Sequence, residues 1–395
     1  MATVRDMTSD ANPSTGEAPT GPVARLDPDM LTGLHERIQR EVDAGRLPTA
    51  QLAIGLDGDV VHTRDFGSST PGTHYSVFSV TKALMAATVW QLLDERTLEV
   101  GTEVRELVPS FAAAEGVTLR HLLTHTGGFP YAPLGPPRWN TREGRHEQFA
   151  RWRLQYPPGE RFEYHATSAH WVIAEMVEVV EGRDYRDVVR ERLLEPLGLD
   201  GMHLGGADAA DAEVAELVTV GEAPGPAELQ EVFGTSEVDL GEVTPEVLLA
   251  FNSPDVRRVG VPGGGAVSDA ASIALLYQHL LHDPLGLWSP EVLAAGTAEV
   301  YCDLVDPLRG IPANRTLGLV LAGDDGHSAL RGMGHRVSPR AFGHNGAAGQ
   351  IAWADPETGM SFAFCTSAVE RDFIHEARRT AAIATRASEV LPPAN

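Results

Sequence analysis

A formal net charge of −24 over 395 residues, from 55 acidic and 31 basic side chains, limits what this chain can bind. Nucleic acids and anionic membranes attract basic surfaces, so we expect neither as a partner. The hydrophobic content of 43% is that of an ordinary globular protein with a sizeable core.

The first residues have the composition of a tail. Residues 1–22 are rich in Thr, Pro, Gly, Ala and Asp, which predicts a disordered segment. They hold no apolar run, so we expect no secretory signal, and no later segment has the ~18–20 apolar residues of a membrane span. Cys302 and Cys365 offer neither a disulfide framework nor a metal-binding spacing. The predicted location is the cytoplasm.

The next segments predict a helix, a hairpin and a second helix. Asp27 can cap a helix that ends at Gly45, with Pro28 in its first turn. Alternating apolar residues then lead to an Asp57-Gly58 pair, a strong hairpin signal. A further helix is expected from near Ser79 to about residue 95.

The rest of the chain is mostly helical until strand patterns return after residue 315. Strands are expected within 316–324 and 349–367, and a final amphipathic helix over 372–391. We therefore predict an α+β fold, with one antiparallel sheet flanked by the N- and C-terminal helices. The predicted sheet domain comprises 23–80 and 305–395, and residues 81–304 form an inserted, mostly helical domain.

A single lysine stands out near the start of the second helix. Of the 31 basic side chains only Lys82 is lysine, and it follows Ser79 by one helical turn. Lysine loses its proton readily when buried, whereas arginine stays charged. Ser79 lies where the helix N-terminus favours developing negative charge, so an S-x-x-K pair could be a nucleophile with its base.

Several segments together resemble a known family. The segments "SVTK", "TLRHLLTHTGGFP", "PPGERFEYHATSAHWVIAEMVE", "VPGGGAVSDAASIALL" and "FGHNGAAGQIAWADPETGMSFAFCTS" occur in this order. In order and spacing they resemble the serine β-lactamase and penicillin-binding-protein superfamily, and are most similar to class C β-lactamases and the related carboxylesterases. The resemblance covers most of residues 30–385 and implies the two-part fold described above.

The resemblance also implies roles for individual residues. Ser79 would be the acylated nucleophile, Lys82 its proton partner, and Tyr164 the phenol that shuttles the proton to the leaving group. The backbone N–H groups of Ser79 and Ala347 would form the oxyanion hole. The expected oxyanion and substrate-binding positions are Ala347, His344, Asn345, Gly346 and His165.

Two departures from the family pattern bear on the substrate. The Y-x-N motif is Tyr164-His165-Ala166 here, so the asparagine that grips a substrate amide is missing. The K-T-G motif is His344-Asn345-Gly346, which removes a fixed cation that helps hold a β-lactam carboxylate. Both changes argue against antibiotic hydrolysis and favour neutral esters.

Other patterns carry weaker signals. His121 and His125 have a metal-binding spacing but no evident third ligand, which favours a structural turn. His165 either lines the pocket or packs in the core. The sequence "GHSAL", with Ser328 at its centre, lacks the final glycine of a hydrolase elbow. No dinucleotide or phosphate-binding motif is present, and Lys82 lacks the phosphate cradle that a pyridoxal phosphate site needs, so no cofactor is predicted.

The sequence thus predicts a serine acyl-transfer enzyme acting on a small-molecule ester or amide. We favour a carboxylesterase-type hydrolase. A transacylase that moves the acyl group to an amine or alcohol in small-molecule, antibiotic-type biosynthesis is the first alternative. A β-lactamase or a non-catalytic binding module is the second.

Overall fold

The structure is a computed structural model that describes residues 21–238, 241 and 243–391. Its α-helices are α1 (Pro28–Asp43), α2 (Thr81–Asp94), α3 (Val104–Leu107), α4 (Leu119–Leu123), α5 (Arg142–Phe149), α6 (Ser168–Glu181), α7 (Tyr185–Val189), α8 (Gly206–Asp211), α9 (Pro226–Phe233), α10 (Pro245–Leu249), α11 (Pro254–Val259), α12 (Ala270–His282), α13 (Pro290–Thr297) and α14 (Phe373–Glu389). Its strands are β1 (Thr49–Leu56), β2 (Asp59–Gly67), β3 (Tyr75–Ser76), β4 (Met202–Leu204), β5 (Val218–Val220), β6 (Ala266–Ser268), β7 (Val305–Asp306), β8 (Ile311–Pro312), β9 (Val320–Leu321), β10 (Phe342–Gly343), β11 (Ile351–Asp355), β12 (Met360–Thr366) and β13 (Ala368–Glu370).

The main sheet is antiparallel and is built from both ends of the chain, as predicted. Its strand order is β2-β1-β12-β11-β10-β9, so β1 from the N-terminal part pairs with β12 from the C-terminal part. Asp57 and Gly58 form the β1–β2 turn, with φ angles of 56° and 86°. Positive φ at both central residues is what a tight hairpin turn of this twist requires.

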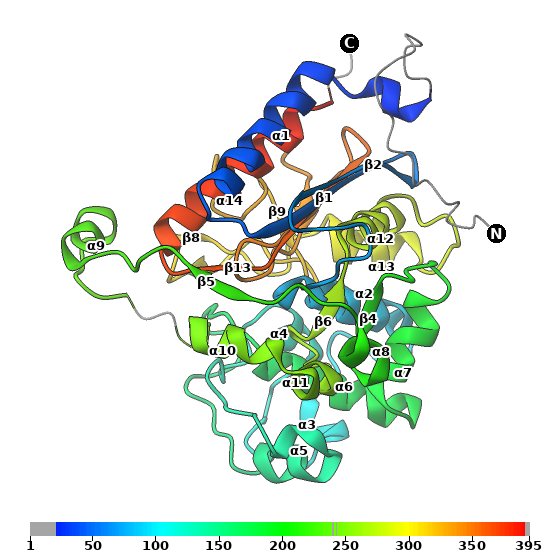
Figure 1. Ribbon diagram of the computed structural model, residues 1–395. Coiled ribbons are helices and arrows are strands. Elements are labelled where there is room, and N and C mark those ends of the chain that lie inside the picture. Colours follow the sequence, from blue (N-terminus) through cyan, green and yellow to red (C-terminus); the bar gives the residue numbers. More distant parts are fainter. Residues whose placement is uncertain (1–20, 239–240, 242, 392–395) are drawn as a thin grey trace.

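Helices cover both faces of this sheet. The terminal helices α1 and α14 lie side by side over one face (Figure 1). Asp27 caps α1, as its sequence predicts, by accepting hydrogen bonds from the N–H groups of Asp29 and Met30. Helix α12 packs against β1, β11 and β12 on the other side. The sheet is therefore buried between the helix pair and a second, mainly helical layer.

Helix α2 forms the centre of the helical layer. Every residue from Thr81 to Leu92 is buried, and α6, α7 and α13 pack around the helix. A helix that is apolar all round needs such a surrounding, because it has no face to offer to water. The small sheet β3-β6-β4 runs beside the start of α2 and ties it to the segment before α12.

Of the remaining predictions on organisation, some are confirmed and others stay predictions. The α+β class and the antiparallel sheet with flanking terminal helices are confirmed. The division into 23–80 with 305–395 and 81–304 stays a prediction. The predicted tail falls almost wholly outside the described residues; Pro22–Arg25 forms a short 3₁₀ turn. Within the described ranges, the helices are all too short or too polar to cross a membrane.

Candidate active site

The expected nucleophile lies in a strained turn directly before α2. Residues Phe78–Val80 form a single 3₁₀ turn, and Phe78 adopts a φ of 46°, which is unfavourable for a bulky side chain. The hydroxyl of Thr81 donates to the Phe78 carbonyl at 2.5 Å and accepts from the N–H of Ala266 at 3.0 Å. Strand β6 thereby holds the turn, and the side chain of Ser79 stays partly exposed.

Lys82 is fully buried one turn further along and is directed at Ser79. Its Nζ donates to Ser79 Oγ at 3.1 Å, to the Ala166 carbonyl at 2.7 Å and to the Gly263 carbonyl at 2.6 Å. Two carbonyls from separate segments therefore fix the amine beside the hydroxyl. With three acceptors around its three N–H groups, the lysine side chain is an ammonium whose positive charge lies beside the Ser79 hydroxyl.

Tyr164 completes the group from the loop before α6. Its Oη lies 3.0 Å from Ser79 Oγ, and Lys82 Nζ lies 5.1 Å from the centre of its ring. Burial raises the pKa of Tyr164, but the charges of Lys82 and Arg315 outweigh burial, so the pKa lies below its ordinary value. A phenol of this kind can act as a base nearer to neutral pH.

Buried imidazoles surround Tyr164. The His125 ring lies 4.6 Å from the Tyr164 ring, and the His344 ring lies 6.1 Å from it. Burial, with the charges of Lys82 and Arg315 adding to it, holds the pKa values of His125, His170 and His344 well below their usual range. These histidines are therefore neutral and leave the cationic role to lysine and arginine.

The segment His344–Ala347 runs against the nucleophile turn. A Cβ atom added to Gly346 would lie 2.3 Å from the carbonyl oxygen of Val77, so only glycine permits this approach. Ala347 packs with Phe78 in a small apolar cluster. The structure thus brings Ala347 and Gly346 to the turn that carries Ser79.

Two of the expected substrate-binding side chains are held by the protein itself. The Asn345 amide donates to the Gly332 carbonyl at 2.8 Å, and its oxygen accepts from the N–H of Ala352 at 3.1 Å. His165 is fully buried; its Nε2 accepts from the N–H of Phe129, and its Nδ1–H donates to the Glu163 carbonyl. Substrate contact by these side chains stays a prediction, and the geometry favours a supporting role for both.

His344 is placed differently from the lysine whose position it takes in the motif. It is buried, its Nδ1–H donates to the Asn345 carbonyl at 2.9 Å, and its N–H donates to the hydroxyl of Tyr277 at 2.9 Å. Its remaining ring nitrogen, Nε2, has no hydrogen-bond partner within the part of the chain that the structure describes. The imidazole therefore adds a neutral polar atom, and no charge, to the site.

Sequence reasoning missed three groups that the structure brings to the site. The carbonyls of Ala166 and Gly263 that hold Lys82 are backbone atoms, for which the sequence carries no signal beyond the "PGGG" run. Arg315, whose guanidinium carbon lies 5.4 Å from the centre of the Tyr164 ring, directly precedes the strand expected within 316–324. One arginine among 30 gives no reason to single it out.

The weaker sequence signals have structural explanations. Nδ1 of His121 accepts from the N–H of Thr118 and closes the first turn of α4, while His125 packs on Tyr164. Ser328 donates to the Gly334 carbonyl at 2.6 Å and is buried. In the parts of the chain that the structure describes, no group of three or more His, Cys, Asp or Glu side chains could hold a metal ion.

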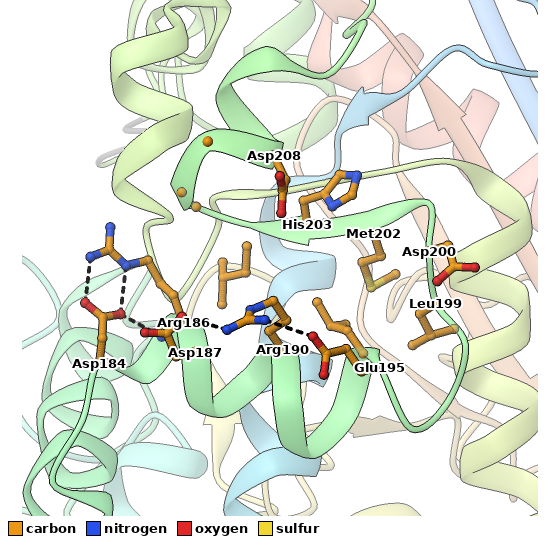
Figure 2. Close-up of a pocket in the computed structure, with 15 residues that line it drawn as sticks. Asp184, Arg186, Asp187, Arg190, Glu195, Leu199, Asp200, Met202, His203 and Asp208 are labelled. Carbon is orange, nitrogen blue, oxygen red and sulfur yellow. Dashed lines mark hydrogen bonds and ion pairs between the residues drawn. The ribbon is translucent and has the colours of Figure 1, made fainter.

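A hollow of about 520 Å³ lies on the surface between α7, β4 and α8 (Figure 2). Arg186 pairs with Asp184 there, and Arg190 pairs with Asp187 and Glu195. None of Ser79, Lys82 and Tyr164 lines it. We place the active site by its chemistry rather than by the volume of this hollow.

Comparison with known proteins decides the family. The sequence model described as Beta-lactamase matches residues 34–386. The chain belongs to the β-lactamase family. It is accordingly an enzyme of the serine hydrolase class built on the β-lactamase fold.

Similar proteins carry several activities in their names. The chain is 28% identical over 305 residues to the esterase/β-lactamase LipL of Mycobacterium tuberculosis, covering 73% of this chain and 67% of LipL. It is 30% identical over 276 residues to penicillin-binding protein 4 of Amycolatopsis lactamdurans, covering 62% and 70%.

Solved structures agree in fold. A penicillin-binding protein homologue from Caulobacter crescentus matches with a TM-score of 0.75 and 24% identity, covering 93% of this chain and 99% of that one. A family VIII carboxylesterase matches with a TM-score of 0.71 and 21% identity, covering 91% and 97%. At these identities the likeness speaks for the fold alone.

Proposed function

We propose that this enzyme is a carboxylesterase-type hydrolase that works through an acyl-enzyme on Ser79. One observation carries the proposal: Ser79 Oγ lies within hydrogen-bond distance of both Lys82 Nζ, at 3.1 Å, and Tyr164 Oη, at 3.0 Å. A hydroxyl between a buried amine and a tyrosine of lowered pKa has what a serine needs to become a nucleophile.

In acylation, Ser79 Oγ attacks the ester carbonyl while its proton passes to the Tyr164 oxygen. The N–H groups of Ser79 and Ala347 are the proposed donors to the oxyanion. When the tetrahedral intermediate collapses, the bond to the leaving alcohol breaks and Tyr164 returns the proton to the alcohol oxygen. Lys82 keeps Tyr164 in its anionic form before the attack.

Deacylation reverses these roles. A water molecule attacks the acyl carbonyl, gives one proton to Tyr164, and the bond to Ser79 Oγ breaks. Tyr164 then passes the proton back to Oγ, which releases a carboxylic acid and restores the starting state. Each proton taken up by Tyr164 is returned within the same half-reaction, so the cycle balances without a cofactor.

The surroundings support an ester rather than a β-lactam as the substrate. The Y-x-N asparagine is replaced by Ala166, and the K-T-G lysine by the neutral, buried His344. Relatives named as esterases agree with this proposal. Steady-state turnover of para-nitrophenyl butyrate, compared with nitrocefin, tests it: the ester should be consumed and the β-lactam left intact.

The transacylase alternative differs from the hydrolase in the molecule that accepts the acyl group, an amine or alcohol instead of water. One structural neighbour is described as a hydrolase with promiscuous acyltransferase activity, at 19% identity and a TM-score of 0.69. Adding a series of amines and alcohols to the ester assay and measuring acylated products by mass spectrometry separates the two. If an amide or a new ester forms faster than the free carboxylic acid, the enzyme is a transacylase. Failure to consume any ester would favour the β-lactamase or binding-module alternatives.

The cytoplasmic location stays a prediction.

A further inference from the structure

Arg315 is a buried cation for which the described residues provide no counter-charge. It is 5% exposed, and its Nε and Nη1 atoms are buried without a hydrogen-bond partner. Among the described residues its side chain makes no salt bridge. Its guanidinium carbon lies 5.4 Å from the ring centres of both Phe162 and Tyr164. Burying a charge without a counter-charge is costly, so this placement needs a reason.

The backbone holds Arg315 in this place from two sides. Its N–H donates to the Cys302 carbonyl at 2.8 Å, and its carbonyl accepts from the N–H of Tyr301 at 2.7 Å. Three residues later, Gly318 adopts a φ of 114°, and a Cβ atom there would lie 2.5 Å from Cβ of Ala86 on α2. The loop that carries Arg315 is therefore pressed against the helix that carries Lys82.

The charged and titratable groups around the two side chains leave one candidate for a counter-charge. The groups that interact electrostatically with Tyr164, Arg315 and their immediate neighbours are Lys82, His125, His165, His170, Cys302, Asp306, Arg309 and His344. Among these groups the one carboxylate, Asp306, already pairs with Arg309 at 2.7 Å, and the histidines are neutral. Burial raises the pKa of the Cys302 thiol, so the thiol stays protonated. The Tyr164 oxygen remains as the group that can become an anion.

We propose that Arg315 is a positioning residue for the reaction, whose guanidinium keeps Tyr164 as a phenolate poised to take the proton of Ser79. The inference rests on the proposed function, in which Tyr164 is that base. The negative charge of a phenolate spreads into its ring, so a cation over the ring stabilises the anion more than the neutral phenol.

This assignment explains how the site works without the K-T-G lysine. His344 adds no positive charge at that position, and Arg315 from another segment supplies one beside the same tyrosine. Burial lowers the pKa of Arg315 to about 10, which leaves the guanidinium charged at neutral pH. Arg315 therefore acts through Tyr164, and the cation is not set aside for a substrate carboxylate.

The test compares Arg315→Gln, Arg315→Lys and the unchanged enzyme in two measurements. The first is the ultraviolet absorbance of the Tyr164 phenolate as a function of pH, isolated by subtracting the titration of a Tyr164→Phe variant. The second is the pH profile of kcat/KM for para-nitrophenyl butyrate and for a matched ester that carries a carboxylate. Arg257→Gln serves as a control, because Arg257 is a buried arginine whose hydrogen bonds, among the described residues, all go to backbone carbonyls elsewhere in the fold.

We expect Arg315→Gln to move both the Tyr164 titration and the acid limb of kcat/KM to higher pH by about one to two units. Arg315→Lys should restore most of the shift, and Arg257→Gln should leave both curves in place. A folded Arg315→Gln variant with an unmoved titration would overturn the proposal. So would a loss confined to the carboxylate ester, which would make Arg315 a substrate anchor. The absorbance readout needs no turnover, so it remains decisive if the proposed function fails.

Discussion

Two regions meet at the active site: the nucleophile turn, Phe78–Val80, and the third-motif segment, His344–Ala347, which stands where the family has K-T-G. They use their residues in opposite ways. In the turn, Ser79 and Lys82 point their polar atoms at one another. In the segment, His344 and Asn345 turn into the protein, and Gly346 brings the backbone close to Val77. Side-chain chemistry matters in the first region and backbone shape in the second. Substitutions should separate these two roles.

The sharpest test of the first region is Ser79→Ala. Without the hydroxyl no acyl-enzyme can form, so kcat/KM for an activated ester should fall by about 10⁴-fold or more. Ser328→Ala is the matched control, since Ser328 binds the Gly334 carbonyl and should be dispensable for activity. Ester turnover retained in Ser79→Ala, or lost in the control, would break the comparison.

Lys82→Arg tests whether the turn needs the compact lysine ammonium or only a positive charge beside Tyr164. Arginine keeps its proton and cannot reproduce the compact contacts to the Ala166 and Gly263 carbonyls. We expect a loss of about 10²- to 10⁴-fold in kcat/KM. The circular dichroism spectrum should stay unchanged, which shows that the fold is retained. Near-normal activity in Lys82→Arg would reduce the role of Lys82 to charge alone.

The pH profile tests the partner that both regions share. Burial raises the pKa of Tyr164, but the charges of Lys82 and Arg315 lower it by more than burial raises it. The phenolate therefore forms at lower pH than in free tyrosine. Activity should therefore rise with pH along an acid limb that ends below about 10, the value of free tyrosine. Tyr164→Phe should lose about 10²-fold or more of kcat/KM together with this limb. An acid limb that survives in Tyr164→Phe would assign it to another group.

Gly346→Ala tests the claim that backbone shape is what the third-motif segment contributes. The added methyl group would lie 2.3 Å from the Val77 carbonyl, so the segment must move away from the nucleophile turn. We expect about a 10- to 100-fold loss of kcat/KM, since small misplacements of a catalytic donor are costly. An unchanged rate would mean that the Ala347 N–H does not form the oxyanion hole.

The smallest effect is expected from Asn345→Ala. The side chain binds the backbone of Gly332 and Ala352, so its loss should cost about 1–2 kcal/mol in the free energy of unfolding. The melting temperature should fall while kcat/KM for the ester changes little. A large increase in KM with unchanged stability would instead show that Asn345 binds substrate.

Much of the fold, and the proximity of Ser79 and Lys82, could be predicted because they follow from local patterns. The Asp27 cap, the Asp57-Gly58 turn and the lone Lys82 one turn after Ser79 are signals that a short stretch of sequence carries by itself. The position of Arg315 could not be predicted, since it depends on tertiary contacts of a loop that precedes the expected strand and carries no pattern of its own. The buried state of His165 and the backbone contacts of Asn345 were likewise set by packing.

The central claim, an activated serine at the start of α2, is tested most directly by intact mass after exposure to a fluorophosphonate probe, followed by peptide mapping. The account predicts one adduct per chain on Ser79, absent from Ser79→Ala and strongly slowed in Lys82→Ala. No adduct on the folded protein, or an adduct on Ser328 in place of Ser79, would contradict it.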